Sequence, residues 1–288
     1  MWSVKLTKTI DTLVEDVYAL FGSEKEFHKG LAEEYGRRMS EIVTGRISSK
    51  GFEPKLRMSN LGQPCERKLY WDIKEDPDKQ EVMPPAALFK FLFGDILEEV
   101  LLYLAKEAGH LVQGEQDLCE IDGVRGKRDA VIDGMVVDVK SCSTPAFAKF
   151  QYGLTDENDD FGYRTQLQSY LYAAQDDPLV TIKDRAAFWA VDKTLGKMCL
   201  DVYKKDGVDY HAVVDDKRTI LAGPTPARGF TDTEDGKSGN RKLKTNCSYC
   251  HWKKKCWPTL RTFYYGNGPR HLTKVVVRPQ AHIREEKG

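Results

Sequence analysis

The stretch that decides the fold is Arg128–Ser141, which reads RDAVIDGMVVDVKS. Two apolar runs flank Asp133-Gly134, a dipeptide suited to a two-residue hairpin turn because glycine accepts a positive φ without strain. Residues two apart on a strand point to the same face, so Asp138 and Lys140 project together, and Asp129 on the preceding strand lies within reach. Charged groups in an apolar strand cost free energy unless they pair or hold an ion. The stretch therefore predicts a hairpin with a polar centre on one face.

The surrounding chain predicts helices on both sides of this hairpin. A long apolar segment, 86–109, reads as a helix that ends at a glycine. Alternating apolar runs and turn dipeptides predict strands, and helical spacing predicts a second helix. The strands are expected at 111–121, 124–132, 135–141, 185–191 and 197–203, and the second helix at 163–174. This order predicts a mixed α/β (α+β) domain in which most antiparallel strand pairs are sequence neighbours.

Composition excludes several classes of protein. The 288 residues are 41% hydrophobic and 31% charged, which is typical of a globular chain and excludes a disordered chain, a collagen or a coiled coil. The most apolar stretch, 86–104, carries four charged residues, whereas a membrane span needs about 20 apolar residues. Residues 1–8 contain no apolar signal region. We therefore expect a cytoplasmic protein, whose seven cysteines are thiols or metal ligands.

The two ends of the chain differ in character. Helical spacing over Thr9–Arg46 predicts one or two amphipathic helices, an N-terminal annex (1–50) in which we see no chemistry. Turn residues predict linkers at 48–54 and 223–239. The remaining divisions are a core at 58–222 and a C-terminal segment at 237–288 that packs on it.

The C-terminal segment is strongly basic. Residues 237–288 hold thirteen Lys and Arg against two acids, a net charge of +11, although the whole chain sums to zero. Aromatic residues alternate with the basic ones, and basic side chains neutralise phosphates while aromatic faces stack on unpaired bases. The segment therefore predicts contact with nucleic acid, with Lys253, Lys254 and Lys255 as the densest group; a solvated tail that offsets an acidic body is the alternative.

Two further elements carry polar groups toward the hairpin. The long helix contains GDILEE at 94–99, which supplies Glu98 and Glu99. In the second helix, Gln166 and Tyr170 share one face at a spacing of four residues. Each of these elements alone reads as ordinary solvent-facing or core positions, and only their combination is specific.

Three cysteines near the C-terminus form the second signal. Cys247, Cys250 and Cys256 have the close spacing of thiolates that share a metal centre, as in zinc and iron–sulfur sites. A fourth ligand is needed, and His251 is the local candidate while Cys65 is the distant one. Cys119, Cys142 and Cys199 fall in predicted strands and read as small buried hydrophobic residues.

The combined order resembles the RecB-type branch of the PD-(D/E)XK nucleases. The matching residues are a Gly-X-X-X-Glu helix, Asp129, the triplet 138–140, and Gln-X-X-X-Tyr. Glu98 stands where that branch usually has histidine. The resemblance implies a PD-(D/E)XK core and a metal-dependent DNA exonuclease acting on single-stranded DNA or duplex ends. It implies Mg²⁺ or Mn²⁺ on Glu98, Asp129, Asp138 and the Val139 carbonyl; catalytic roles for Asp129, Asp138, Lys140, Gln166 and Tyr170; and a DNA contact by Arg164.

The cysteines are similar to those of the iron–sulfur RecB-like nucleases, which include AddB and the exonucleases of CRISPR adaptation. There a lone upstream cysteine followed by basic and aromatic residues, here Cys65-Glu-Arg-Lys-Leu-Tyr-Trp, joins a C-terminal group of three. The resemblance implies a [4Fe–4S] cluster on Cys65, Cys247, Cys250 and Cys256. It also implies a partner protein from recombination, replication or CRISPR adaptation, in a bacterial or virus-infected cell.

Two other functions fit the same residues. One is a non-catalytic DNA-binding module that uses the polar centre only as a backbone clamp. The other is an RNA-directed protein with a Zn²⁺ site closed locally by His251.

Overall fold

The structure is a computed structural model that describes residues 8–24, 26–48, 53–266 and 268–286. The chain divides into two units, each built from two stretches of sequence. Unit 1 comprises 1–62 and 84–214, and unit 2 comprises 63–83 and 215–288. The division differs from the expected one, because 63–83 groups with the C-terminal residues and not with the core at 58–222. Residues 49–52 of the expected linker at 48–54, like residues 1–7, lie outside the described part.

Unit 1 is a mixed sheet flanked by helices, so the predicted α/β class is confirmed. The five-stranded sheet has the order β1-β4-β5-β6-β7, in which β5 and β6 are parallel and the other pairs antiparallel. Its elements are η1 (Ile10–Thr12), α1 (Leu13–Leu20), α2 (Lys29–Ser48), α3 (Met58–Leu61), α5 (Pro85–Glu107), β1 (Val112–Gln113), β2 (Leu118–Ile121), β3 (Val124–Lys127), β4 (Ala130–Ile132), β5 (Met135–Cys142), α6 (Thr144–Gln151), α7 (Tyr163–Ala173), β6 (Arg185–Asp192) and β7 (Met198–Lys204).

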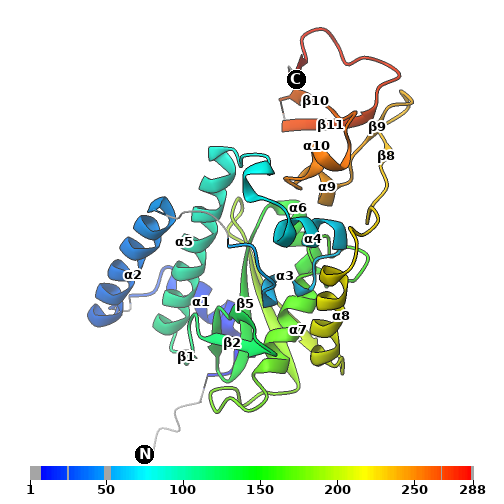
Figure 1. Ribbon diagram of the computed structural model, residues 1–288. Coiled ribbons are helices and arrows are strands. Elements are labelled where there is room, and N and C mark those ends of the chain that lie inside the picture. The colour runs from blue at the N-terminus through cyan, green and yellow to red at the C-terminus, as the bar shows by residue number, and fades with distance from the viewer. Residues whose placement is uncertain (1–7, 25, 49–52, 267, 287–288) are drawn as a thin grey trace, which may run out of the picture. The chain divides into compact units, whose positions relative to one another are not determined.

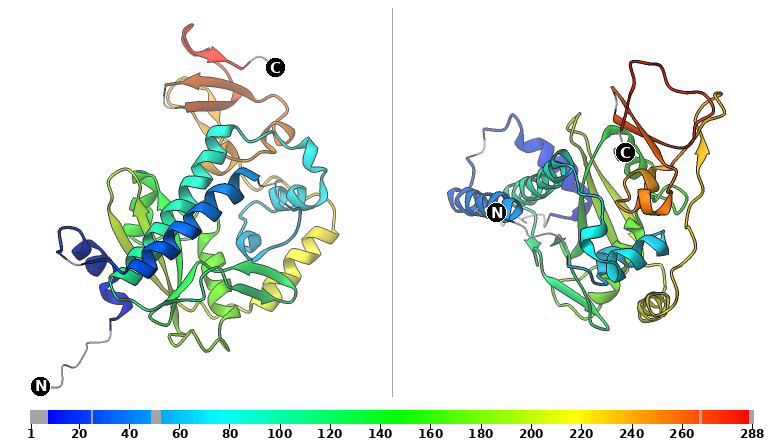
Figure 2. Two further views of the ribbon diagram at one scale, coloured as in Figure 1. Left: turned by 90° about the vertical axis from the view of Figure 1, so that its left-hand side faces the viewer. Right: turned by 45° about the horizontal axis from the view of Figure 1, so that its top comes forward.

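Each face of this sheet is covered by its own pair of helices. Helices α6 and α7 pack on one face and α1 and α5 on the other, and each face buries a separate apolar cluster. The predicted annex forms α1, which is buried against the sheet, and α2, which lies alongside α5 (Figures 1 and 2). The strand alternation therefore decides which helices each side chain of β4 and β5 meets.

The two Asp-Gly dipeptides form the expected hairpin turns. Asp133 and Gly134 have φ values of +48° and +83°, and Asp122 and Gly123 have +48° and +77°. A Cβ on Gly134 would come within 2.0 Å of Thr181 Oγ1, so only glycine fits there. These turns set the register in which Ile132 pairs with Met135.

The strands expected at 111–121 and 124–132 are each broken in two. Residues 118–127 form a separate hairpin of β2 and β3. The break in the second strand falls at Arg128, which is 2% exposed and pairs with Asp117 at 2.9 Å and Asp177 at 2.6 Å. A buried guanidinium is costly unless it is paired with carboxylates. At Arg128 the chain leaves the strand where the side chain meets these two partners.

Sequence reasoning also missed two helices, α6 and α8 (Tyr210–Ala222); the chain division falls within α8. No helix in the described ranges is both long and apolar enough to cross a membrane.

Unit 2 contains a second five-stranded sheet, which the sequence did not reveal. Its order is β12-β10-β11-β9-β8. The elements are α4 (Glu66–Lys74), η2 (Pro77–Lys79), β8 (Thr233–Glu234), β9 (Arg241–Lys242), α9 (Thr245–Ser248), α10 (Lys253–Cys256), β10 (Arg261–Tyr265), β11 (Gly268–Lys274) and β12 (Arg284–Glu285). Strand β8 lies inside the linker expected at 223–239, so that part is not featureless.

Candidate active site and cysteine site

The polar centre lies on the face of the sheet that α6 and α7 cover. In β4 and β5, Val131 and Val136 pack into the cluster beneath these helices, while the alternate residues face α1 and α5. Asp138 and Lys140 share the parity of Val136 in β5 and therefore project to the same face. Asp129 lies just before β4, not in it as expected, and its carboxylate reaches the same site beside Asp138. The prediction that the three side chains point together is confirmed.

Short contacts join these groups. Lys140 Nζ lies 2.5 Å from Asp138 Oδ1, and Asp129 Oδ2 accepts a hydrogen bond of 2.7 Å from the Val139 amide. Asp138 is only 2% exposed, and its Oδ2 accepts no hydrogen bond within the described ranges. A carboxylate oxygen buried in this way is suited to binding a cation.

Glu98 joins the site from α5. Its Oε1 accepts a hydrogen bond of 2.8 Å from Gln116 Nε2, whereas the adjacent Glu99 pairs with Arg38 at 2.8 Å. Gln116 has a φ of +58°, an uncommon conformation for a residue with a side chain. The resemblance singles out Glu98, and the structure gives the two glutamates these different partners. Sequence reasoning missed Gln116, because its place in the site leaves no local pattern.

The electrostatics show that the carboxyl groups crowd one another. Burial, with the neighbouring Asp138 and Glu98, raises the pKa of Asp129 well above its ordinary value. Burial and the Asp138 carboxylate likewise raise the pKa of Glu98 to about 7. Burial alone would lower the pKa of Lys140, but the Asp138 and Asp129 charges raise it, so the lysine is cationic.

These groups fit a divalent cation. Hard carboxylate oxygens are what Mg²⁺ and Mn²⁺ prefer, and a cation would relieve the repulsion that raises the pKa values of Asp129 and Glu98. Throughout the described ranges, however, no three His, Cys, Asp or Glu side chains converge closely enough to hold a metal ion as they stand.

Glu98 and Asp129 open onto a cavity of about 710 Å³. The opposite wall is α2, where we expected no chemistry, and it contributes Arg37, Arg38 and Arg46. Each of these arginines pairs with a carboxylate: Arg37 with Glu41, Arg38 with Glu99 and Glu115, and Arg46 with Asp95. The three arginines are therefore neutralised by these pairs, and the cavity lining as a whole carries more acidic than basic side chains.

The second helix contributes Tyr170 and Gln166. Tyr170 is 3% exposed, and burial together with the Asp138 and Asp129 charges raises the pKa of its hydroxyl, which places it near these carboxylates. Gln166 hydrogen-bonds the Tyr170 side chain. Arg164 instead pairs with Asp156 at 2.5 Å and lies over the Tyr203 ring at 5.4 Å.

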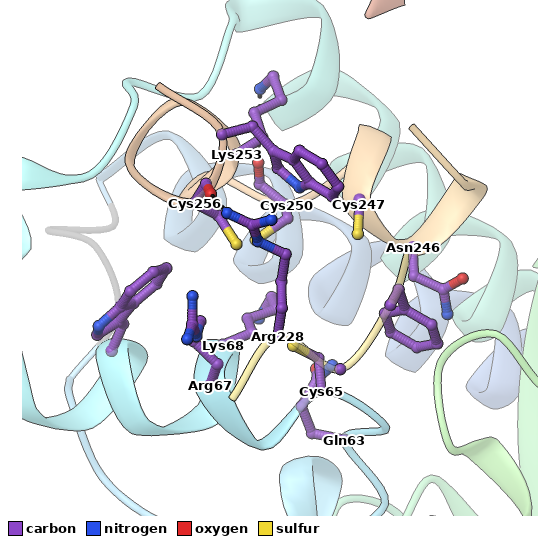
Figure 3. Close-up of a pocket in the computed structure, with 14 residues that line it drawn as sticks. Gln63, Cys65, Arg67, Lys68, Arg228, Asn246, Cys247, Cys250, Lys253 and Cys256 are labelled. Atoms are coloured by element: carbon purple, nitrogen blue, oxygen red, sulfur yellow. Dashed lines mark hydrogen bonds between the residues drawn. The ribbon is translucent and has the colours of Figure 1, made fainter. Parts of the chain in front are cut away.

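The four cysteines predicted to act together line one pocket of unit 2. Figure 3 shows the sulfur atoms of Cys65, Cys247, Cys250 and Cys256 facing the space across which Arg228 extends. Cys65 is the N-cap residue of α4, and the other three come from the α9–α10 region. The distant cysteine thus lies with the three local ones.

The four thiols line one pocket, although within the described residues they do not converge closely enough to hold a metal ion as they stand. Burial and the neighbouring thiols Cys65 and Cys256 raise the pKa of Cys247 to about 11, and burial raises that of Cys250 to about 12. Neutral thiols this difficult to ionise become ligands once a metal supplies positive charge. A Cβ on Gly229 would lie 3.1 Å from Cys65 Sγ, so the backbone approaches closely here.

The free space in the pocket is about 30 Å³, and Arg228 is among the residues that line it. The Arg228 guanidinium now lies 4.1 Å from the centre of the Trp257 ring and donates a hydrogen bond to the Cys256 carbonyl. Sequence reasoning assigned Arg228 and Gly229 to a linker and gave them no role.

His251 does not line this pocket. Its Nε2 lies 2.7 Å from Asp72 Oδ1, the oxygen that also accepts a hydrogen bond of 2.7 Å from Trp252 Nε1. The local candidate for a fourth ligand is therefore engaged with α4 and not with the thiols.

The three lysines predicted to bind DNA are each paired with an acid. Lys253 pairs with Glu81, Lys254 with Glu286 at 3.0 Å, and Lys255 with Glu75. Lys255 also lies over the rings of Trp71 and Trp252, at 4.8 Å and 5.4 Å. These contacts give the lysines a structural role, and DNA binding by them stays a prediction.

Comparison with known proteins adds little. No family model matches the chain, and no curated protein matches it. It is similar to a solved structure titled "Crystal structure of SSO0001", with 14% identity and a TM-score of 0.42 over 76% of this chain and 93% of that one. A likeness of this degree carries no argument, and no family is thereby shown for the chain.

Proposed function

We propose that the protein is a metal-dependent nuclease that hydrolyses phosphodiester bonds of DNA, as an exonuclease on single-stranded DNA or duplex ends. The observation that carries the proposal is the meeting of four side chains in a buried polar centre beside a large cavity: Glu98 from α5, Asp129 from the residue before β4, and Asp138 and Lys140 from β5. A PD-(D/E)XK core belongs to the same proposal.

The chemistry requires these residue types. A divalent cation held by Asp129, Asp138 and the Val139 carbonyl would supply the positive charge that polarises an anionic phosphate. Lys140, cationic beside Asp138, orients the attacking water and offsets the negative charge that grows on the phosphate oxygens. Glu98, whose carboxyl group lies near the Asp138 carboxylate, would be a further oxygen ligand of the cation.

We also propose that Cys65, Cys247, Cys250 and Cys256 hold a [4Fe–4S] cluster. Their common pocket and the engagement of His251 with Asp72 support four cysteine ligands over a Zn²⁺ site closed by the histidine. The cluster would have a structural role, fixing the start of α4 to the α9–α10 region.

Digestion of end-labelled single- and double-stranded DNA with Mg²⁺ or Mn²⁺ tests the proposed activity. Asp138→Asn removes a ligand charge at constant side-chain length, and Lys140→Ala removes the cation. Each should lower the cleavage rate at least about a hundredfold. The matched control is Asp11→Asn, at an exposed position, which should cleave normally. Undiminished cleavage by both site variants would remove the assignment.

A further inference from the structure

A second cavity of unit 1, of about 110 Å³, adjoins the proposed catalytic lysine. The end of β5, helix α6 and the segment that leads into α7 form its walls. Lys140 and Lys149 line it together with Phe150, Phe161 and Tyr163. Lys140 therefore belongs to both places: its ammonium group pairs with Asp138 in the polar centre, and its side chain lines this cavity.

Aromatic rings form much of this cavity. The Phe161 and Tyr163 ring centres are 5.5 Å apart, and those of Phe150 and Tyr163 are 6.2 Å apart. Lys140 Nζ lies 4.7 Å from the centre of the Tyr163 ring. Phe161 is 42% exposed, so solvent reaches part of this residue.

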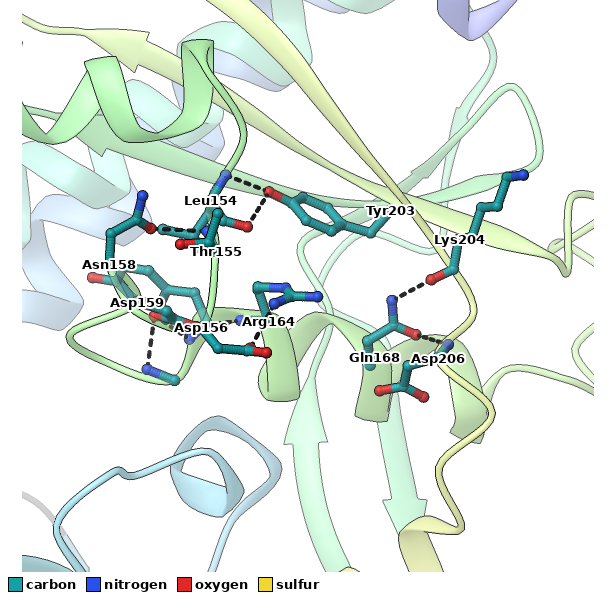
Figure 4. Close-up of polar contacts among 12 residues, drawn as sticks. Leu154, Thr155, Asp156, Asn158, Asp159, Arg164, Gln168, Tyr203, Lys204 and Asp206 are labelled. Carbon is teal, nitrogen blue, oxygen red and sulfur yellow. Dashed lines mark hydrogen bonds and ion pairs between the residues drawn. The ribbon is translucent and has the colours of Figure 1, made fainter.

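The segment that carries Phe161 is held firmly. Tyr203 Oη accepts a hydrogen bond of 2.6 Å from the Leu154 amide (Figure 4). Its own proton has two acceptors within reach, the Asp201 carboxylate at 2.5 Å and the Leu154 carbonyl at 3.0 Å. The Asp159 carboxylate accepts hydrogen bonds from the amides of Gly162, Tyr163 and Arg164 at 2.9–3.0 Å. The aromatic wall is thus in place before any ligand arrives, which lowers the entropy cost of binding.

The acids of the cavity are already compensated. Asp159 is engaged by three amides, and Asp160 pairs with Lys149 at 2.6 Å. A polyanion approaching Lys140 therefore meets little uncompensated negative charge on this side.

We propose that this cavity receives one unpaired nucleobase beside the phosphate that Lys140 contacts, with the base stacked on Phe161. The proposal rests on the proposed nuclease function and specifies its substrate as single-stranded nucleic acid. A paired base would first have to leave its stack, whereas an unpaired base enters without that cost. Stacking on an aromatic ring tolerates any base, so the site selects strandedness and not sequence.

The test compares Phe161→Ala with Phe161→Trp and with the matched control Tyr152→Ala. Tyr152 is 84% exposed, ends the neighbouring helix α6, and does not line the cavity. With single-stranded DNA and Mn²⁺, Phe161→Ala should lower kcat/KM about 5- to 150-fold, the range that stacking of one base supplies. Phe161→Trp and Tyr152→Ala should stay near the wild type.

An abasic nucleotide placed at successive positions of the oligonucleotide locates the base. At one position of the strand, the abasic nucleotide should lower kcat/KM of the wild type about as much as Phe161→Ala does. At that same position the abasic nucleotide should not lower kcat/KM of Phe161→Ala any further. If the wild type and Phe161→Ala cleave intact and abasic strands at equal rates, the base site is refuted. If that cleavage still requires Asp138, the nuclease proposal nevertheless stands.

Binding measured without metal separates the two proposals. A single strand containing 2-aminopurine should be quenched on binding to wild type and to Phe161→Trp, and not to Phe161→Ala. Quenching without any cleavage would refute the nuclease function and keep the base site. Equal quenching by all the variants would refute the base site. Circular dichroism of each variant checks that it folds.

Discussion

Replacing Asp72 tests the network that joins α4, with Cys65 at its start, to the segment that carries Cys250. The Asp72 carboxylate lies 2.7 Å from both His251 Nε2 and Trp252 Nε1, and 2.5 Å from Lys68 Nζ. One side chain therefore connects two segments of unit 2 that are about 180 residues apart in sequence.

The expected cost of Asp72→Ala follows from these three partners. Trp252 is 1% exposed, and a buried indole N–H left without an acceptor costs about 2 kcal/mol. The half-exposed pair with Lys68 adds up to about 1 kcal/mol, and the contact with His251 about 1 kcal/mol. We expect the free energy of unfolding to fall by about 3–4 kcal/mol, against about 1 kcal/mol for Asp72→Asn, which keeps an acceptor.

Urea denaturation at pH 7, followed by tryptophan fluorescence, measures this loss. Burial alone would raise the pKa of Asp72, but His251 and Lys68 hold it below its ordinary value, so the stabilisation is complete above about pH 4 and is lost as the pH falls further. The control is Asp215→Asn, at a surface carboxylate, which should change stability by less than about 0.5 kcal/mol. If Asp72→Ala costs no more than this control, the network does not hold the two segments together.

Three other outcomes are expected. Cys65→Ala should lose bound iron, brown colour and thermal stability together, as read by iron analysis and absorbance, while Cys199→Ala in β7 keeps all three; full iron in the former would exclude Cys65 as a ligand. Burial and the nearby Lys253 lower the pKa of His271 to about 4, so the fold should lose up to about 3 kcal/mol between pH 6.5 and pH 4, where only the unfolded chain takes up the proton. In urea titrations at pH 6.5 and pH 4, His271→Asn should show a smaller difference in the free energy of unfolding than the wild type. An unchanged difference would show that His271 is not the group responsible. Neutralising the lysines at 253–255 should lower the salt slope of DNA affinity by less than three units because each is already paired, and a drop of three or more would show that all three contact phosphates.

The parts of the fold that could be predicted depend on neighbouring residues. The Asp-Gly turns, the parity of β5 and the spacing in α7 are local patterns, and each is present in the structure. The break at Arg128 could not be predicted, because it depends on Asp177, about 50 residues away. Three of the five strands in the sheet of unit 2 were missed because β8, β9 and β12 are two residues long and rich in charged residues, so they lack the apolar alternation that marks a strand.

In the candidate site, too, some residues could be predicted from their sequence neighbours and others could not. Asp138 and Lys140 follow from strand alternation, whereas Asp129 lies in the break before β4 and its place depends on the Val139 amide. The resemblance points to Glu98, but the partners that distinguish it from Glu99, Gln116 and Arg38, come from other elements. Phe161 carries no signal in a loop rich in acids, and its place beside Lys140 is set by packing.

The composition of unit 2 from two distant stretches has a consequence for synthesis. Cys65 leaves the ribosome 182 residues before Cys247 (247 minus 65), which at about 5–20 residues per second is roughly 10–40 s. During that time α4 has none of its partners from 215–288, and its buried Trp71 face is uncovered. The nascent chain therefore exposes a thiol and an apolar helix face together until residues 215–288 have been made.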